Sequence, residues 1–301
     1  MGRKILAEIE KLKQENNAVL LSHFYQPSEI QDLADYVGDS FGLSQQAAET
    51  DANTIVFCGV SFMAEVAAIL SPSKTVLLPE ETAGCPMADM VTVEGLRKVK
   101  QQHPDAAVVS YINTSAAIKA ESDICCTSAN VLKVVNSLSQ DQIIFVPDRN
   151  MGQYVAARTD KEIILWQGYC YAHDGLMAET IIKAKQDYPQ ALVMVHPECS
   201  PEVAAMADYV IGTTGMLKIA READASTFIV GTEIGLAHAL KQAAPSKEFI
   251  FPDPNLFCSS MKQTTLDKVK RSLETLRPRI SVPMDIAAKS RQALEKMLTV
   301  K

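Results

Sequence analysis

An imidazole or phenol side chain is followed 17 residues later by a hydroxyl side chain at three places in the chain. The pairs are His23 with Ser40, Tyr111 with Ser128, and His196 with Thr213. Each first residue ends an apolar run, and each hydroxyl stands at a turn that opens a helical segment. A hydroxyl at a helix N-terminus adds to free N–H groups and a positive dipole end, which together bind anions. Three such sites around one centre would hold several carboxylates or a phosphate, whereas each alone also fits plain helix capping.

Three of the seven cysteines follow the same repeat. Cys85, Cys170 and Cys258 are separated by 85 and 88 residues, and each lies near Gly or Pro in a predicted turn. Three thiolates are too few for a structural zinc site or an ordinary electron-transfer cluster, which use four. They suit a [4Fe–4S] cluster with one open iron, and an open iron acts as a Lewis acid. Three buried thiols are the alternative, and we expect burial alone for the remaining cysteines, Cys58, Cys125, Cys126 and Cys199.

Further polar residues surround the same predicted strand ends. They are His23, Tyr25, Tyr111, Asn113, His196 and Glu198. Ligands of open parallel sheets bind outside the carboxyl ends of the strands. A single histidine there is more often structural, but two at equivalent positions, with Tyr25 and Glu198 two residues further on, predict an acid–base set.

Short apolar runs alternate with helical segments along the whole chain. Because the runs are continuous and do not alternate with polar residues, they predict parallel strands buried on both faces. The predicted strands are 18–23, 54–58, 75–78, 107–112, 142–146, 162–166, 191–196, 227–230 and 248–251, and the clearest helices are 3–15, 129–138, 177–186 and 265–276. The repeat divides the chain into three α/β units, predicted at residues 1–104, 105–190 and 191–301, the last with additional C-terminal helices.

The composition of the chain argues against nucleic-acid and membrane partners. The chain has 301 residues with 29 basic and 36 acidic side chains, a net charge of −7, and no basic cluster, which argues against nucleic-acid binding. No apolar run approaches the roughly 18 to 20 residues that cross a bilayer, so no membrane partner is expected. Without a recognisable secretory signal, we expect a cytoplasmic protein whose cysteines form no disulfides.

The sequence resembles the quinolinate synthases, the quinolinate synthetase A family of iron–sulfur enzymes of de novo NAD biosynthesis. The resemblance covers about residues 5 to 275. Its motifs include Ser22-His23-Phe24-Tyr25-Gln26, Ala83-Gly84-Cys85-Pro86-Met87, Tyr111-Ile112-Asn113, Gly168-Tyr169-Cys170, Val195-His196-Pro197-Glu198-Cys199 and Met261-Lys262-Gln263-Thr264-Thr265.

The resemblance implies three pseudo-threefold-related, three-layer α/β/α domains with short parallel sheets and the active site at their common centre. It implies a [4Fe–4S] cluster on Cys85, Cys170 and Cys258 with one open iron. The implied reaction condenses iminosuccinate with dihydroxyacetone phosphate to quinolinate, with an L-aspartate oxidase or dehydrogenase as the implied source of iminosuccinate. The implied substrate contacts are His23, Ser40, Tyr111, Asn113, Ser128, His196, Glu198 and Thr213, with Tyr25 and Glu198 as the proton-transfer pair.

The sequence departs from the family at a few places. Ser61 stands where the family often has histidine, Tyr171 where proline is common, and no extra cysteine adjoins Cys258. The residues by themselves also leave two other functions open. One is a hydro-lyase that acts on another polyacid through the same open iron, and the other is a polyanion-binding protein without catalysis.

Overall fold

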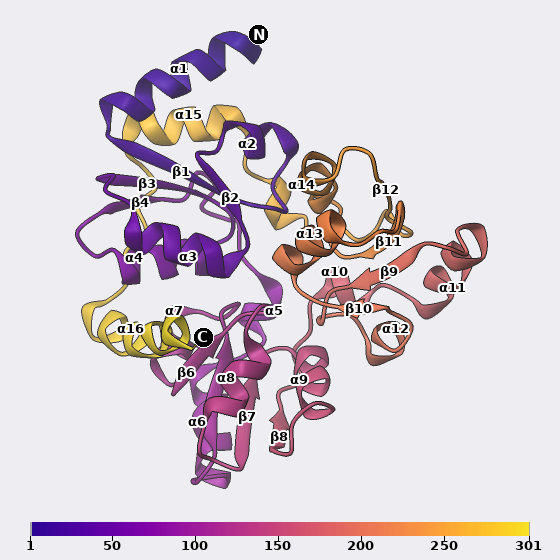
Figure 1. Ribbon diagram of the computed structural model, residues 1–301. Helices are drawn as coiled ribbons and strands as arrows, with labels where there is room; N and C mark the ends of the chain where they lie inside the picture. Colours follow the sequence, from indigo (N-terminus) through magenta and orange to yellow (C-terminus); the bar gives the residue numbers. More distant parts are fainter. Residues whose placement is uncertain (1, 301) are drawn as a thin grey trace.

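Each third of the chain forms one four-stranded parallel sheet in the computed structural model, which describes residues 2–300 (Figure 1). The sheets have the orders β2-β1-β3-β4, β6-β5-β7-β8 and β10-β9-β11-β12. The strands are β1 (Ala18–His23), β2 (Tyr36–Gly38), β3 (Thr54–Cys58), β4 (Thr75–Leu77), β5 (Ala107–Tyr111), β6 (Ile124–Cys126), β7 (Gln142–Val146), β8 (Glu162–Leu165), β9 (Leu192–Val195), β10 (Tyr209–Val210), β11 (Thr227–Gly231) and β12 (Glu248–Ile250). The predicted α/β class is confirmed.

The register of the strands repeats from sheet to sheet. The first strand of each sheet pairs with residues 15 positions later, as in Leu21 with Tyr36, Val109 with Ile124, and Met194 with Tyr209. An aspartate before each second strand also accepts a backbone N–H bond of 2.7 Å from the first strand; these aspartates are Asp35, Asp123 and Asp208. The repeat seen in the sequence is therefore a repeat of hydrogen bonding.

Helices connect and cover the strands. They are α1 (Gly2–Glu15), α2 (Ser28–Leu33), α3 (Ser40–Glu49), α4 (Ser61–Leu70), α5 (Pro86–Asp89), α6 (Val93–Gln102), α7 (Ala116–Ala120), α8 (Val131–Ser137), α9 (Arg149–Ala156), α10 (Tyr171–Asp174), α11 (Ala178–Asp187), α12 (Pro201–Ala204), α13 (Thr213–Glu222), α14 (Leu236–Ala243), α15 (Leu266–Thr275) and α16 (Met284–Thr299), with the 3₁₀ turn η1 (Ser260–Lys262). Several begin with a side-chain cap, such as Asp39 on α3 and Thr265 on α15.

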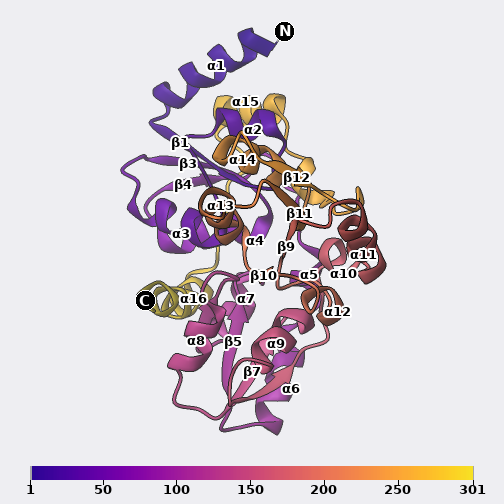
Figure 2. The ribbon, with the colours of Figure 1, turned by 45° about the vertical axis from the view of Figure 1, so that its right-hand side comes forward.

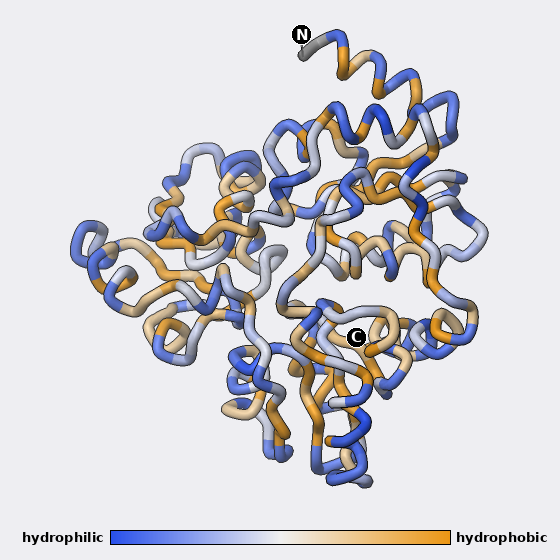
Figure 3. The backbone as a smooth tube through the Cα atoms, turned by 180° about the vertical axis from the view of Figure 1, so that it is seen from behind, coloured by the Kyte–Doolittle hydropathy of each residue, from blue (hydrophilic) through white to orange (hydrophobic). Residues whose placement is uncertain are grey.

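Each sheet is buried on both faces, as the continuous apolar runs predict. One face of every sheet contributes to a shared central core; Phe57, Phe145 and Phe228 are examples. The opposite faces form three separate cores, which include Val56, Ile144 and Ile229. In Figure 3 the apolar strands accordingly lie inside each lobe and the polar stretches lie around them. The layers are therefore helix, sheet and helix, repeated three times.

The last two helices return to earlier parts of the chain. Helix α15 packs against α1, and α16 packs against α7, β6 and α4 (Figures 1 and 2). Helix α6 contributes Leu96 to the core on the outer face of the second sheet. The domain boundaries at residues 104 and 190 stay a prediction. No helix within residues 2–300 is long and apolar enough to cross a membrane.

The predicted strands are all present, with ends that differ by at most one residue. The prediction missed the three second strands, β2, β6 and β10, each two or three residues long. Segments this short carry no periodicity of their own, and they become strands because the neighbouring first strand offers free backbone groups to pair with.

Candidate active site

The carboxyl ends of the strands of all three sheets surround one cavity. Every residue that the sequence analysis placed in the site lines it. These are His23, Tyr25, Ser40, Cys85, Tyr111, Asn113, Ser128, Cys170, His196, Glu198, Thr213 and Cys258. Residues up to 235 positions apart in the chain thus meet in one place, as the repeat predicts.

The three cysteines occupy equivalent positions in loops that follow β4, β8 and β12. All are free thiols, and each sulfur faces the backbone N–H of the residue three positions later. Burial raises the pKa of Cys85 to about 12 and also raises the pKa of Cys170 and of Cys258. The thiols are therefore protonated until a metal displaces the proton.

Two buried carboxylates hold cysteine loops in place. The Asp148 carboxylate accepts the Cys170 N–H at 3.2 Å, and the Glu233 carboxylate accepts the Cys258 N–H at 3.1 Å. Both acids follow the third strand of their sheet, β7 or β11. The second and third loops are also joined to each other, because the Tyr171 hydroxyl accepts the Ser259 N–H at 2.9 Å.

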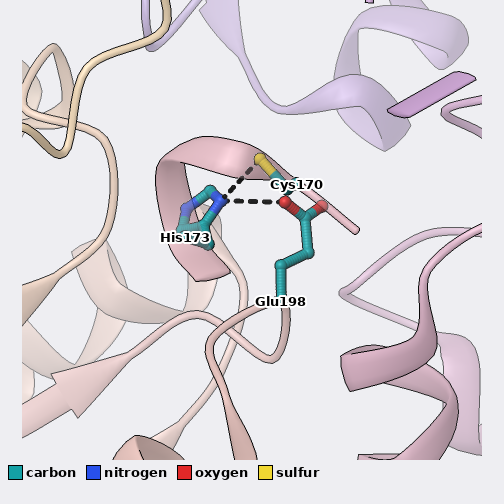
Figure 4. Close-up of side chains that lie close together, drawn as sticks. All are labelled: Cys170, His173 and Glu198. Atoms are coloured by element: carbon teal, nitrogen blue, oxygen red, sulfur yellow. Dashed lines mark hydrogen bonds and ion pairs between the residues drawn. The ribbon is translucent and has the colours of Figure 1, made fainter. Parts of the chain in front are cut away.

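Glu198 interacts with several side chains in the cavity, and Figure 4 shows its contact with His173. Its carboxylate accepts the Tyr111 hydroxyl at 2.6 Å and lies 2.8 Å from Nδ1 of His173. Burial alone raises the pKa of a carboxyl group, but His196, His173 and the Tyr111 hydroxyl bring the pKa of Glu198 well below its usual value. Glu198 is therefore a carboxylate, able to accept a proton.

His23 and His196 have matching environments in their two units. Nδ1 of each accepts the backbone N–H two residues later, from Tyr25 at 3.1 Å and from Glu198 at 3.3 Å. Burial lowers the pKa of each imidazole to about 3. Both rings are therefore neutral at pH 7, and their remaining proton is on Nε2, where it can be donated to a bound anion.

A chain of hydrogen bonds joins Tyr25 to Glu198. The Tyr25 hydroxyl lies 2.7 Å from the Thr232 hydroxyl, which lies 2.9 Å from Nε2 of His173, and Nδ1 of His173 lies 2.8 Å from the Glu198 carboxylate. Burial, followed by the Glu198 charge, raises the pKa of Tyr25 well above 10, so its phenol stays protonated. His173 and Thr232 were not among the predicted site residues, although Cys170-x-x-His173 is a spacing that often marks metal sites.

The three hydroxyl residues differ in detail. Ser40 and Thr213 are the first residues of α3 and α13, as expected. Ser128 lies in the turn that opens α8, which begins at Val131 after the N-cap Asn130, so it precedes the first helical residue. The Oδ1 atom of Asn113 is buried without a hydrogen-bond partner.

No lysine or arginine is found among the described residues that line the cavity. Arg149, which is outside the lining, pairs with Asp174 at 3.0 Å and stacks on Tyr169. Ser61, at the position where the family often has histidine, is also outside the lining, while Tyr171 is part of it. An anion in this cavity would be held by neutral donors.

A carboxylate–imidazole–phenol network beside three thiols in one cavity has the residue types of an enzyme active site, with groups that could hold a metal ion. The comparisons with known proteins give the family. Residues 7–299 match the model of the quinolinate synthetase A protein family. The chain is 54% identical over 297 residues to the quinolinate synthase of Geotalea uraniireducens and 52% identical over 297 residues to quinolinate synthase 1 of Methanosarcina acetivorans, covering 99% of this chain and 98% of each relative. The chain belongs to this family of enzymes, and the resemblance is confirmed.

Proposed function

We propose that this chain condenses iminosuccinate with dihydroxyacetone phosphate, forming quinolinate and releasing phosphate and two waters. The observation that carries the proposal is the meeting of three free cysteines and the Tyr25–Glu198 network in one cavity. Family membership supports the same reaction.

The cysteine set fits a [4Fe–4S] cluster with three protein ligands. Cys85, Cys170 and Cys258 line the same cavity, and the sulfur of each faces a backbone N–H. Hydrogen bonds to sulfur are a common feature of such clusters and help to set their potentials. When bound, the cluster would supply an open iron that assists the loss of a hydroxyl group as a Lewis acid.

The chain's own residues bind and orient the substrates. We assign the anionic groups of both substrates to Nε2–H of His23 and His196 and to the hydroxyls of Ser40, Ser128 and Thr213. The unpartnered amide oxygen of Asn113 would accept a hydrogen bond from the substrate. Neutral donors can hold two anionic substrates close together without binding either one as tightly as an ion pair would.

Tyr25 and Glu198 would carry the proton transfers. Isomerisation of the ketone requires removal of a proton from carbon and delivery of a proton to the neighbouring oxygen. The Glu198 carboxylate is available for the first role because it is ionised, and the Tyr25 phenol is available for the second because it is protonated. His196 would keep Glu198 oriented through the Glu198 N–H that its Nδ1 accepts.

The test compares three variants with the wild type after anaerobic reconstitution, by iron and sulfide content, visible spectrum and quinolinate formation. Cys85→Ala should lose both cluster and product. Glu198→Gln should keep the cluster and turn over at least about a hundredfold more slowly, the usual loss when a general acid or base is removed. Cys58→Ala is the control, because Cys58 is buried away from the cavity, and it should keep both. Full activity without the cluster, or in Glu198→Gln, would contradict the proposal.

The immediate supplier of iminosuccinate in the cell would be an enzyme that oxidises L-aspartate, either an oxidase or a dehydrogenase. We place this chemistry in the cytoplasm, since seven free thiols suit a reducing compartment. This chain, mixed with a purified supplier enzyme, aspartate and dihydroxyacetone phosphate, should form quinolinate. Without the supplier enzyme, no quinolinate should form.

A further inference from the structure

One corner of the cavity brings together a sulfur, a nitrogen and an oxygen ligand. The Cys170 thiol, the His173 imidazole and the Glu198 carboxylate each offer one atom, and these atoms lie within 4.8 Å of one another (Figure 4). Cys170 and His173 belong to a single turn at the start of α10, and Glu198 arrives from the loop after β9. His173 and Glu198 are buried, so the corner is built into the fold.

This donor set matches a divalent ion of the zinc class. Zinc binds sulfur at about 2.3 Å, imidazole nitrogen at about 2.0 Å and carboxylate oxygen at about 2.0 Å, in tetrahedral geometry. Nδ1 of His173 now lies 3.2 Å from the Cys170 sulfur and 2.8 Å from the nearer Glu198 oxygen. A tetrahedral ion requires these separations to be roughly 3.3 to 3.6 Å. Nδ1 therefore needs to move away from the sulfur and from the oxygen by less than about 1 Å, and the sulfur and the oxygen already lie within 4.8 Å of each other.

Other side chains already hold the three ligands in position. Thr232 lies 2.9 Å from Nε2 of His173, and the Tyr111 hydroxyl lies 2.6 Å from the other Glu198 oxygen. Such outer contacts fix ring orientation and strengthen ligand basicity in metal sites.

We propose that Cys170, His173 and Glu198 form a single-ion site for a zinc-class divalent cation when no cluster occupies the cavity, with a fourth position open to water. The sulfur–metal bond forms as the Cys170 thiol releases its proton to solvent. His173 binds the ion through Nδ1 and carries its proton on Nε2, from which it donates to Thr232, and Thr232 in turn donates to the Tyr25 oxygen. Because Cys170 is shared, this ion and the cluster exclude each other.

The site concerns the cluster-free chain and does not depend on the reaction proposed above. Its cellular consequence is competition, because a zinc-class ion bound first would block cluster assembly. The main rival is a site of three sulfurs from Cys85, Cys170 and Cys258. The proposed site requires His173 and Glu198 and does not require Cys85, whereas the three-sulfur site requires Cys85 and neither of the other two residues.

The experiment titrates the cluster-free full chain with Zn²⁺ under anaerobic conditions and measures stoichiometry and affinity by calorimetry. The wild type, Cys85→Ala and Cys258→Ala should each bind one ion with similar affinity. His173→Gln and Glu198→Gln should bind at least tenfold more weakly, since each lacks a ligand. Loss of binding in Cys85→Ala, or unchanged binding in His173→Gln and Glu198→Gln, would overturn the proposal.

X-ray absorption of the zinc-loaded wild type needs no variant and therefore stands even if a substitution prevents folding. We expect one sulfur and two or three nitrogen or oxygen neighbours, whereas three sulfurs, or fewer than one zinc per chain, would overturn the assignment. Zinc-loaded wild type should also fail to regain iron and sulfide until a chelator removes the zinc; reconstitution with the zinc retained would contradict the shared use of Cys170. These measurements report metal binding, so they test the zinc site even if the chain fails to form quinolinate.

Discussion

Replacing Lys262 by methionine should destabilise the loop that carries Cys258. The Glu233 carboxylate is fully buried, and the Lys262 ammonium lies 2.8 Å from one of its oxygens and 2.9 Å from the other. The same ammonium also donates to the Tyr25 carbonyl. Lys262→Met keeps most of the length of the side chain and removes only its charge and its hydrogen bonds.

The expected loss of stability depends on the hydrogen bonds that Glu233 retains in the variant. Two backbone N–H groups still donate to it, from Gly235 at 2.7 Å and from Cys258 at 3.1 Å. Removing one partner of a buried ion pair costs about 3 to 5 kcal/mol. Because the two amides remain and the Lys262 side chain is 18% exposed, we expect a loss of about 2 to 4 kcal/mol in the free energy of unfolding.

Urea unfolding of the cluster-free protein measures this loss. Far-ultraviolet circular dichroism and the fluorescence of Trp166 follow the transition together, and the free energy is taken from a two-state fit where the two signals coincide. The double variant Glu233→Gln/Lys262→Met completes a thermodynamic cycle, in which we expect a coupling of about 2 kcal/mol. Lys270→Met is the matched control, since its ion pair with Glu8 lies on the surface and should matter little.

A cost below about 1 kcal/mol for Lys262→Met, or additive effects in the cycle, would refute the reasoning. Either result would mean that the two amides satisfy the buried carboxylate without a counter-ion.

Two further predictions concern the loops of the other two cysteines. Gly168→Ala should lower the free energy of unfolding by about 1 to 3 kcal/mol, because the new methyl carbon would lie 2.5 Å from the Pro147 carbonyl oxygen. Gly84→Ala is the control and should be nearly neutral, because the nearest atom to its methyl carbon would be 3.9 Å away. Thermal unfolding compares the two variants, and equal losses of stability would contradict the steric argument. The pKa of Glu80 is lowered from 4.5 to about 2, mainly by the hydrogen bond from the Lys268 ammonium and further by hydrogen bonds from Thr82. Wild type should therefore exceed Glu80→Gln in stability by roughly 1 kcal/mol above pH 4.5 and lose this advantage as the pH falls toward 2; a difference that does not change with pH would contradict it.

Much of the fold and most of the site were predictable because the chain repeats itself. The strand registers are the same in all three sheets, so a fixed spacing in sequence becomes a fixed place at the carboxyl edge of a sheet. This is why the distance of 17 residues from His23 to Ser40, and its two counterparts, located the cavity. The regular spacing of Cys85, Cys170 and Cys258 predicted their shared position at the cavity for the same reason.

The repeat could not reveal His173 or Thr232, because neither has a counterpart. His173 lies three residues after Cys170, where the other two cysteines have Ala88 and Met261. Thr232 likewise has no hydroxyl counterpart in the other two units. Only the packing of the second unit against the third shows that these two side chains complete a hydrogen-bonded path from Tyr25 to Glu198.

The departures from threefold symmetry are what permit chemistry at this centre. A symmetric ring of donors binds an anion, but it treats all sides of the substrate alike and cannot remove a proton at one atom while delivering one at the next. Two residues after each lead position the chain has Tyr25, Asn113 and Glu198, so a phenol, an amide and a carboxylate occupy equivalent places. The repeated backbone supplies the shared positions of these groups, and the differences in side chain give each one a separate task. Substitutions that restore the symmetry, such as Glu198→Asn, should therefore preserve the cavity and abolish turnover.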